Sequence, residues 1–448
     1  MKPLVIKGGC IVDPSQGINR VSDMVLVGGT VAWIGERGAA PSIEDSMILL
    51  AQGLVICPGF IDLHCHLREP GQEQNETIAT GTQAAANGGF AAVCCMPNTN
   101  PPVDSRAMIN YISTKALDVG AVRVLPIGCI TKGREGKCLT NMHELAQAGA
   151  IGFSDDGAPV MDTNLMRHAL EHSGDIGLPL IEHCEDTSLS KQGAMNESRV
   201  AAKLGIKGIP AKAEECMVAR DLSLAELTGA RLHITHVSTE GSVRLIRQAK
   251  ARGINVTADA TPHHLTLTEE RVMTHGTNAK VNPPLRTQKD VDTLIEGLGD
   301  GTIDAIATDH APHTIAGKQG DFATAAFGIS GLETAFGVLM GLVHDGKIDM
   351  VSLLAKLTCN PAKIIGPSRN RDRERDTCPT GDLMVDLARD ITIFDPEVEW
   401  MVDPEAFVSK GKNSPWAGCV LKGRVVMTIA NGEVVYRDST INIVDCMN

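Results

Sequence analysis

The sequence lacks the features that mark several large classes of protein. It contains no block of Lys and Arg, and its formal net charge is -13 at pH 7. A surface for nucleic acid or for an anionic membrane needs clustered positive charge, so neither partner is expected. An anionic substrate must therefore meet a cation at a local site.

Long apolar runs and a secretory leader are also missing. No stretch reaches the ~18 consecutive apolar residues of a membrane span, because Gly, Asp or His interrupts each run. Residues 1–9 contain neither an apolar segment nor a small-residue cleavage site, so we expect a cytoplasmic protein. The 448 residues have room for a barrel of about 250 residues and an accessory domain.

Short apolar runs alternate with helix-like segments through the middle of the chain, as βα units require. Eight such runs occupy 60–64, 90–96, 122–129, 150–154, 178–182, 231–236, 254–258 and 303–308. Glycine-bounded β-like runs precede them and resume between 390 and 436. We predict an α/β protein with a (β/α)8 TIM-like barrel over 58–370. Residues 1–57 and 371–448 are expected to form one small β-sandwich domain.

Ligand-type side chains follow the predicted barrel strands. His64 and His66 are two residues apart at the end of the first run, where strand geometry points both to one face. Alone, this spacing also fits two buried, hydrogen-bonded imidazoles. However, His183, His236 and Asp309 end three later runs, and all strand ends of a barrel meet at one rim. Imidazole and carboxylate ligands in an open shell are typical of catalytic zinc.

These candidates are too many for one closed zinc shell, which favours two ions that share a ligand. Asp155-Asp156 follows the fourth run and offers a bridging carboxylate, although Asp-Asp-Gly is also a common turn. A metal pair acidifies water and polarises an amide carbonyl, as a hydrolase needs. Asp309 is then placed to accept a proton and pass it to the leaving nitrogen.

Further polar residues near these ligands are candidates for substrate binding. Arg68 either offers a bidentate guanidinium to a substrate carboxylate or forms a surface ion pair with Glu69. Asn98 and His313 lie on the same predicted rim, and each could instead brace a loop. The stretch 314–328 is either a mobile lid or a long surface loop.

A series of motifs resembles that of dihydroorotases. PGFIDLHCHLREPG occupies 58–71, and it is followed by MPNT at 96–99, FSDDG at 153–157, TPHHL at 261–265, NPPLR at 282–286 and TDHAPH at 308–313. The resemblance covers the full length, including 393–396 and 431–432. It implies the reversible, zinc-dependent cyclisation of N-carbamoyl-L-aspartate to (S)-dihydroorotate and water, a step of pyrimidine (UMP) biosynthesis.

The resemblance also implies a role for individual residues. One zinc would be held by His64, His66, Asp156 and Asp309. The second would be held by Asp156, His183 and His236, so each subunit would carry one or two zinc ions bridged by Asp156. Arg68, Asn98 and His313 would hold the substrate carboxylate, with Asn282, Phe327 and Gly328 near the ring.

Two details refine the resemblance. Hydantoinases and allantoinases bridge their metals with a carboxylated lysine, but no lysine lies near 153–157. The bacterial subgroup with an Asp bridge is therefore more similar. Asp259-Ala260 departs from the pattern, which leads us to expect Glu and an apolar residue before Thr261.

Two alternative functions share these features. The first is another cyclic amidase, acting on a hydantoin or allantoin ring, but Arg68 and Asn98 favour a substrate with a carboxylate. The second is a metal-free scaffold subunit of aspartate carbamoyltransferase, but all six ligand positions are filled. A catalytic subunit that also docks this transferase is compatible with the sequence, and we expect a homo-oligomer.

Overall fold

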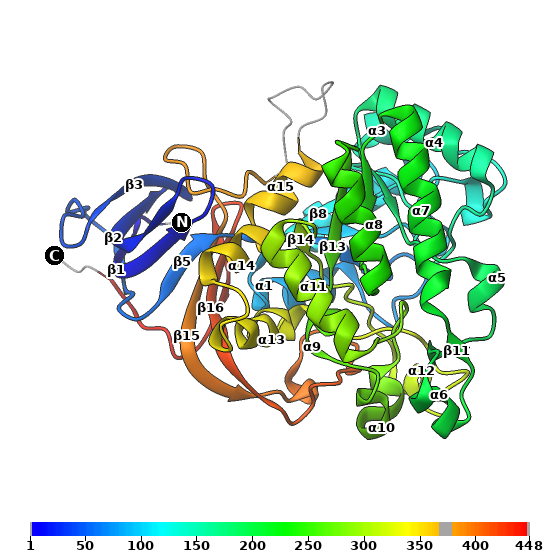
Figure 1. Cartoon of the computed structure of the whole chain (residues 1–448). Coiled ribbons are helices and arrows are strands. Elements are labelled where there is room, and N and C mark those ends of the chain that lie inside the picture. The colour runs from blue at the N-terminus through cyan, green and yellow to red at the C-terminus, as the bar shows by residue number, and fades with distance from the viewer. Residues whose placement is uncertain (1, 367–378, 446–448) are drawn as a thin grey trace.

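The structure is a computed structural model that describes residues 2–366 and 379–445. It has two parts (Figure 1). One is a curved β-sheet, and the other is a set of parallel strands surrounded by helices. The chain is therefore a mixed α/β protein with a sheet domain, as the alternation of apolar runs predicts.

Both ends of the chain contribute to a single nine-stranded sheet. The N-terminal strands are β1 (Leu4–Asp13), β2 (Ile18–Val27), β3 (Thr30–Glu36), β4 (Met47–Leu50) and β5 (Val55–Pro58). The C-terminal strands are β15 (Ile391–Met401), β16 (Val420–Ala430), β17 (Glu433–Arg437) and β18 (Ile443–Asp445). β5 pairs antiparallel with β15, and β4 with β18, so the two terminal segments meet as expected.

The predicted β-sandwich domain contains a single sheet whose hydrogen bonding is continuous. The reason lies in β1, which pairs with β2 along one edge. Its other edge is divided between β4, at residues 4–7, and β5, at Cys10 and Ile11. All nine strands are consequently joined in one branched sheet. Alternate side chains, including Leu4, Ile6 and Met24, pack into its own apolar core.

The middle of the chain forms parallel strands. β6 (Phe60–Cys65), β7 (Phe90–Cys95) and β8 (Arg123–Pro126) make a three-stranded sheet. β9 (Leu180–Glu182), β12 (Leu232–Ile234), β13 (Val256–Ala260) and β14 (Ala305–Ile306) make a four-stranded one. Parallel bridges from Phe153 to Gly128 and to Leu180 link the two sheets, and a bridge joins Cys65 to His310. The predicted fourth strand, 150–154, is thus reduced to one bridging residue.

Helices connect these strands and cover them on the outside (Figure 1). The longer ones are α1 (Ile78–Asn87), α2 (Arg106–Val119), α4 (Thr163–Ile176), α7 (Ala211–Thr228), α8 (Glu240–Ala251), α11 (Gln288–Asp300), α13 (Leu332–His344) and α14 (Met350–Leu357). The shorter ones are α3 (Met142–Ala148), α5 (Thr187–Ser190), α6 (Arg199–Leu204), α9 (Pro262–Thr266), α10 (Arg271–His275), α12 (Ile315–Lys318) and α15 (Cys359–Ile365). Several begin at a side-chain cap; for example, Thr287 accepts a hydrogen bond from the amide of Asp290.

The parallel strands are buried on both faces. Ile61 and Leu63 of β6 belong to one apolar cluster, whereas Phe60 belongs to another that includes the helices. Phe60 also packs edge-on against Phe90 of β7, with 5.8 Å between ring centroids. Strands covered on both faces are apolar along their length, so polar side chains gather at the strand ends.

The residues between β15 and β16 leave the sheet and pack against the helical part. Val402, Phe407 and Trp416 share an apolar cluster with Ile329 and Val338. The C-terminal segment therefore does more than complete the sheet. The boundary predicted at 370/371 lies outside the described residues. Within residues 2–366 and 379–445, no helix has both the length and the apolar character that crossing a membrane requires.

Candidate metal centre

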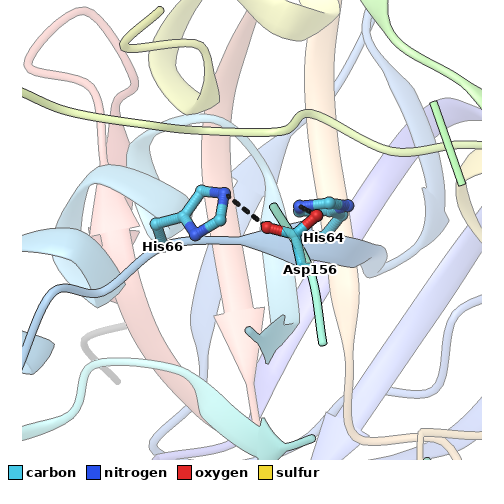
Figure 2. A group of neighbouring side chains, drawn as sticks. All are labelled: His64, His66 and Asp156. Atoms are coloured by element: carbon cyan, nitrogen blue, oxygen red, sulfur yellow. Dashed lines mark ion pairs between the residues drawn. The ribbon is translucent and has the colours of Figure 1, made fainter. Parts of the chain in front are cut away.

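The six predicted metal ligands meet at the ends of the parallel strands. Among the residues that the structure describes, two groups of side chains have ligand atoms close enough to hold an ion, and both contain Asp156. The first adds His64 and His66, which lie on either side of the Asp156 carboxylate in Figure 2. The second adds His183 and His236. All five side chains are buried.

Asp156 is the centre of the cluster. Its Oδ1 lies 3.5 Å from His64 Nε2, 3.6 Å from His236 Nε2 and 3.7 Å from His183 Nδ1. Its Oδ2 lies 3.7 Å from His66 Nε2. Burial alone would raise the pKa of Asp156, but the surrounding imidazoles lower it well below its usual value. A carboxylate with both oxygens facing ligand nitrogens is suited to bridging two ions.

The neighbouring Asp155 has a different role. Its Oδ1 accepts hydrogen bonds from the backbone amides of Ile130 (2.9 Å) and Thr131 (3.1 Å). The Thr131 hydroxyl donates to the other oxygen. Asp155 thus anchors a loop, and the geometry favours Asp156 over Asp155 at the centre of the cluster.

Asp309 lies against the first group. Its Oδ1 is 3.1 Å from His66 Nε2 and 3.4 Å from His64 Nε2. Three predicted site residues other than glycine have positive φ angles, namely Arg68 (60°), His236 (39°) and Asp309 (46°). Such backbone geometry is costly for residues other than glycine and persists where the surroundings enforce it, often at functional sites.

Hydrogen bonds determine which nitrogen of His66 faces the carboxylates. Asn98 Nδ2 donates to Asp156 Oδ2 (3.3 Å), which leaves Asn98 Oδ1 to accept from His66 Nδ1 (2.9 Å). His66 therefore turns Nε2 towards Asp309. Burial lowers the pKa of His66 and favours a neutral ring with a lone pair at Nε2. A lone pair that faces a carboxylate oxygen fits a cation between them.

His64 is oriented by Thr235 and Asp259. Thr235 Oγ1 donates to Asp259 Oδ2 (3.1 Å), so it accepts from His64 Nδ1 (2.9 Å). Within the described part of the chain, the buried His64 Nε2 has no hydrogen-bond partner. Burial lowers the pKa of His64, but Asp156 and Asp309 outweigh it and raise the pKa to about 9. The cluster thus attracts a positive charge, which a metal ion or a proton can supply.

His183 is oriented by Glu185, to which its Nε2 donates at 2.9 Å. Its Nδ1 then faces His236 Nε2, 2.9 Å away. Asn282 Nδ2 donates to the same Glu185 carboxylate at 2.9 Å. Burial would raise the pKa of Glu185, but the His183 contact contributes most to lowering it to about 2. The predicted ring-side residue Asn282 therefore contacts the second group of ligands.

Arg68 contacts the loop that follows Asp309. Its Nε donates to the carbonyl of Pro312 (3.3 Å), and its Nη2 lies 3.2 Å from His313 Nε2. The alternative ion pair with Glu69 is wrong, because Glu69 accepts from the amide of Ile78 and lies 3.7 Å from Lys115. Burial lowers the pKa of Arg68 to about 10, so the group is still a cation at neutral pH.

Of the remaining predicted substrate residues, His313 lies beside Arg68, and Asn282 and Phe327 line a cavity next to the second group of ligands. His313 Nε2 donates to the carbonyl of Phe327 (2.7 Å), and burial lowers the pKa of His313 to about 3. Gly328 has φ 140°, and a Cβ atom there would lie 2.5 Å from the carbonyl of Ala311. A cavity of about 620 Å³ is lined by Glu185, Asn282 and Phe327, among others.

The stretch 314–328 is packed against the body of the protein. Lys280 Nζ donates to the carbonyls of Phe322, Ala323 and Ala325 at 2.6–3.1 Å. Lys318 Nζ donates to the carbonyls of Lys280, Ala326 and Gly328 at 2.8–3.3 Å. Both lysines are buried. In this structure the stretch is an anchored loop.

Sequence reasoning missed several residues that orient the site. Glu185 lies two residues after His183, among the polar residues that follow a predicted strand, so its position could have indicated a role in the site. Asp259 departs from the family pattern, yet it accepts a hydrogen bond from Thr235, which orients His64, and another from the amide of His236 at 2.7 Å. Lys280 and Lys318 gave no signal, because lysine is normally exposed.

Known proteins match this chain along its length. A family model described as Dihydro-orotase-like matches residues 53–242. A protein of Geobacter sp. (strain M21) named dihydroorotase is 49% identical over 434 residues, covering 97% of this chain and 99% of that protein. The dihydroorotase of Pelotomaculum thermopropionicum is 50% identical over 439 residues, with 98% and 99% covered.

Solved structures share the fold at lower sequence identity. The L-hydantoinase (dihydropyrimidinase) from Arthrobacter aurescens superposes with a TM-score of 0.85 and 24% identity, covering 99% of this chain and 98% of that one. The dihydropyrimidinase from Brevibacillus agri NCHU1002 gives 0.82 and 23%, with 98% and 96% covered. The chain thus has the fold of these two structures, and the sequence identities above decide the family. The chain belongs to the dihydroorotase family.

Proposed function

We propose that this protein catalyses the reversible conversion of N-carbamoyl-L-aspartate to (S)-dihydroorotate and water, with one or two zinc ions per subunit. The observation that carries the proposal is the juxtaposition of two opposite sites. A buried cluster of carboxylates and imidazoles contains two groups of ligand atoms that are each close enough to hold an ion, and the buried Arg68 guanidinium, which contacts a backbone carbonyl and the His313 ring, lies beside it. A metal ion and a substrate carboxylate would complete them.

The proposal includes the barrel. Parallel pairing runs from β6 through β7 and β8 to Phe153, and from there through β9, β12 and β13 to β14. The bridge between Cys65 and His310 returns to β6. A ring of eight parallel segments supports a (β/α)8 barrel over 58–370, flanked by sheet segments 1–57 and 371–448.

The metal ligands would be divided between two ions. His64, His66, Asp156 and Asp309 would hold one, and Asp156, His183 and His236 the other. The donor set of imidazoles and carboxylates suits zinc. When bound, zinc supplies Lewis-acid polarisation of a carbonyl and acidifies water.

The protein side chains would perform the remaining tasks. In ring opening, water adds to the ring amide carbon, the C–N bond breaks, and the nitrogen takes up a proton. Asp309 is placed to hold that proton and transfer it, and Arg68, with His313 beside it, would bind the substrate carboxylate. Asn98 would contact the same carboxylate while it orients His66, and Asn282, Phe327 and Gly328 would line the ring side.

Other parts of the proposal concern the setting of the enzyme. As an enzyme of pyrimidine biosynthesis it would work in the cytoplasm, as a homo-oligomer that could dock aspartate carbamoyltransferase. Gel filtration of the protein alone and with the transferase tests both assemblies. Comigration with the transferase would support docking, and separate elution at micromolar concentration would contradict it.

A second candidate is hydrolysis of another cyclic amide, because the solved structures that share the fold are named hydantoinases and dihydropyrimidinases. The deciding experiment measures zinc content and dihydroorotate ring opening on the same preparation, before and after chelation. Bound zinc with zinc-dependent turnover supports the proposal. Turnover of hydantoin or allantoin but not dihydroorotate would favour the second candidate, and absence of both zinc and turnover would favour a scaffold subunit.

A further inference from the structure

A residue of the C-terminal segment reaches the substrate side of the pocket. Asn413 lies in the excursion between β15 and β16, and only 3% of its surface is exposed. Its Oδ1 accepts hydrogen bonds from the amide of His313 (3.1 Å) and the hydroxyl of Ser330 (2.9 Å). Its Nδ2 donates to the carbonyls of Ala311 (3.1 Å) and Gly328 (2.9 Å). Two donors and two acceptor positions are all that an amide side chain offers.

The hydrogen-bond partners of Asn413 belong to two loop segments whose relative position matters for substrate binding. Residues 311–313 carry His313, which contacts Arg68 and the Phe327 carbonyl. Residues 328–330 begin at Gly328, whose backbone approaches Ala311 so closely that no side chain fits there. The Asn413 side chain therefore cross-links the two segments that form the wall beside Arg68.

The packing of Gly411 is independent evidence that the segment around Asn413 lies tightly against the two loop segments. A Cβ atom at Gly411 would lie 2.4 Å from Ser330 Oγ and 2.5 Å from Pro312 Cβ. The excursion can approach the two loops only with glycine at this position. The backbone carbonyl of Asn413 also accepts from the amide of Ser330 at 2.9 Å.

We propose that Asn413 is a positioning residue for substrate binding: by joining 311–313 to 328–330, it sets the place of His313 beside Arg68. The inference rests on the proposed function. It makes the C-terminal segment part of the substrate pocket as well as of the sheet. Asn413 acts through its neighbours and takes no part in proton transfer.

The test compares Asn413→Ala with wild type as full-length, zinc-loaded protein. We expect the KM for dihydroorotate to rise about tenfold or more, while zinc content is unchanged and kcat changes less than KM. Asn360→Ala is the matched control, because Asn360 donates a single hydrogen bond to the backbone of Asp304, the residue before β14. It should leave KM unchanged. An Asn413→Ala variant with normal KM and only a lower melting temperature would overturn the proposal.

Ser330→Ala serves if Asn413→Ala does not fold. It removes one of the four hydrogen bonds, so KM should rise about two- to threefold, and an unchanged KM would again contradict the inference. Amide hydrogen exchange of Asn413→Ala, or of Ser330→Ala in its place, measures the loss of the cross-link in the absence of substrate. Exchange should accelerate in peptides covering 311–314 and 328–331 but not in β1 or β15, and unaltered exchange would overturn the cross-link. Lack of dihydroorotate turnover by the wild type, by contrast, would refute the proposed function.

Discussion

The two sides of the pocket carry opposite charge and are held by different kinds of contact. On the metal side, Asp156 and Asp309 lie among imidazoles whose orientation comes from other side chains, such as Asn98 and Thr235. On the substrate side, the cations are held by backbone carbonyls: Arg68 by Pro312, and the lysines 280 and 318 by the loop that follows His313.

The buried cations differ in how fully the protein itself satisfies their hydrogen-bond donors. Each lysine ammonium has three carbonyl partners, which match its three donors. Arg68 has one carbonyl partner for its five N–H groups besides the neighbouring His313 ring, and His64 Nε2 has none in the described structure. A buried charge with unused capacity is a functional-site candidate, whereas a saturated one is structural.

The largest effect is expected from Asp309→Asn on the metal side. The substitution keeps the shape but removes the charge and the ability to take a proton, so kcat should fall by about 1000-fold. Much of the zinc should remain, because Asp156 and the histidines are intact. Asp155→Asn is the matched control, since that carboxylate anchors a loop, and it should lower the melting temperature with little effect on kcat. Near-normal turnover of Asp309→Asn would remove Asp309 from proton transfer.

The next largest effect is expected from Arg68→Met on the substrate side. Hydrogen bonds to a charged group contribute about 1.5–3 kcal/mol, so kcat/KM for dihydroorotate should fall by about 100-fold. Zinc content should not change, which distinguishes this side from the metal side. Arg68→Lys keeps the charge without the planar fork and should recover part of the loss. An unchanged kcat/KM in the Met variant would show that the substrate carboxylate binds elsewhere.

A smaller effect is expected from Asp259→Asn, because Asp259 orients metal ligands without being a ligand itself. Asp259 orders Thr235, and through it His64, and it also accepts from the amide of His236. Loss of such an outer contact typically weakens metal binding about 10- to 100-fold. Competition with a chelator of known affinity measures this directly. Asp259→Glu, which restores the expected family residue, should bind zinc more tightly than the Asn variant; equal affinities in all three proteins would show that His64 orients itself.

The sequence predicts the two sides of the pocket to different degrees. The metal side could be predicted because His and Asp are unusual at the ends of buried strands and are typical metal ligands. The structure brings all six candidates together. Asp155 and Asp156 could not be separated by pattern, since adjacent residues differ only in which way the chain turns. The difference emerges from the hydrogen bonds that Asp155 makes to residues 130 and 131.

The substrate side depends on contacts that leave no local pattern. Asn413 is 100 residues from His313, in a stretch with no strand-end signal. Lys280 and Lys318 become structural only because loop carbonyls converge on them, which is a property of the folded loop. The sheet shows the same limit: pairing of the terminal segments could be expected, but the division of one β1 edge between β4 and β5 depends on register.

The smallest predicted effect tests whether backbone carbonyls alone satisfy the buried side chain of Lys318. Burial, followed by the nearby Lys280, lowers the pKa of Lys318 from 10.5 to about 7. Between these two values the unfolded chain binds more protons than the folded one, so this residue makes stability rise with pH. The slope is at most about 1.4 kcal/mol per pH unit. Lys318→Met lacks this contribution, so its deficit in unfolding free energy should widen from pH 7 to pH 10.

Urea titrations at several pH values measure this difference, with Lys347→Met, at an exposed site, as the control for the change in net charge. A deficit that stays constant with pH would mean that the carbonyls of Lys280, Ala326 and Gly328 keep the Lys318 ammonium charged throughout. Lys318 would then carry a full charge without a carboxylate partner, and in the described structure Arg68 would differ from it only in having N–H groups that no acceptor satisfies.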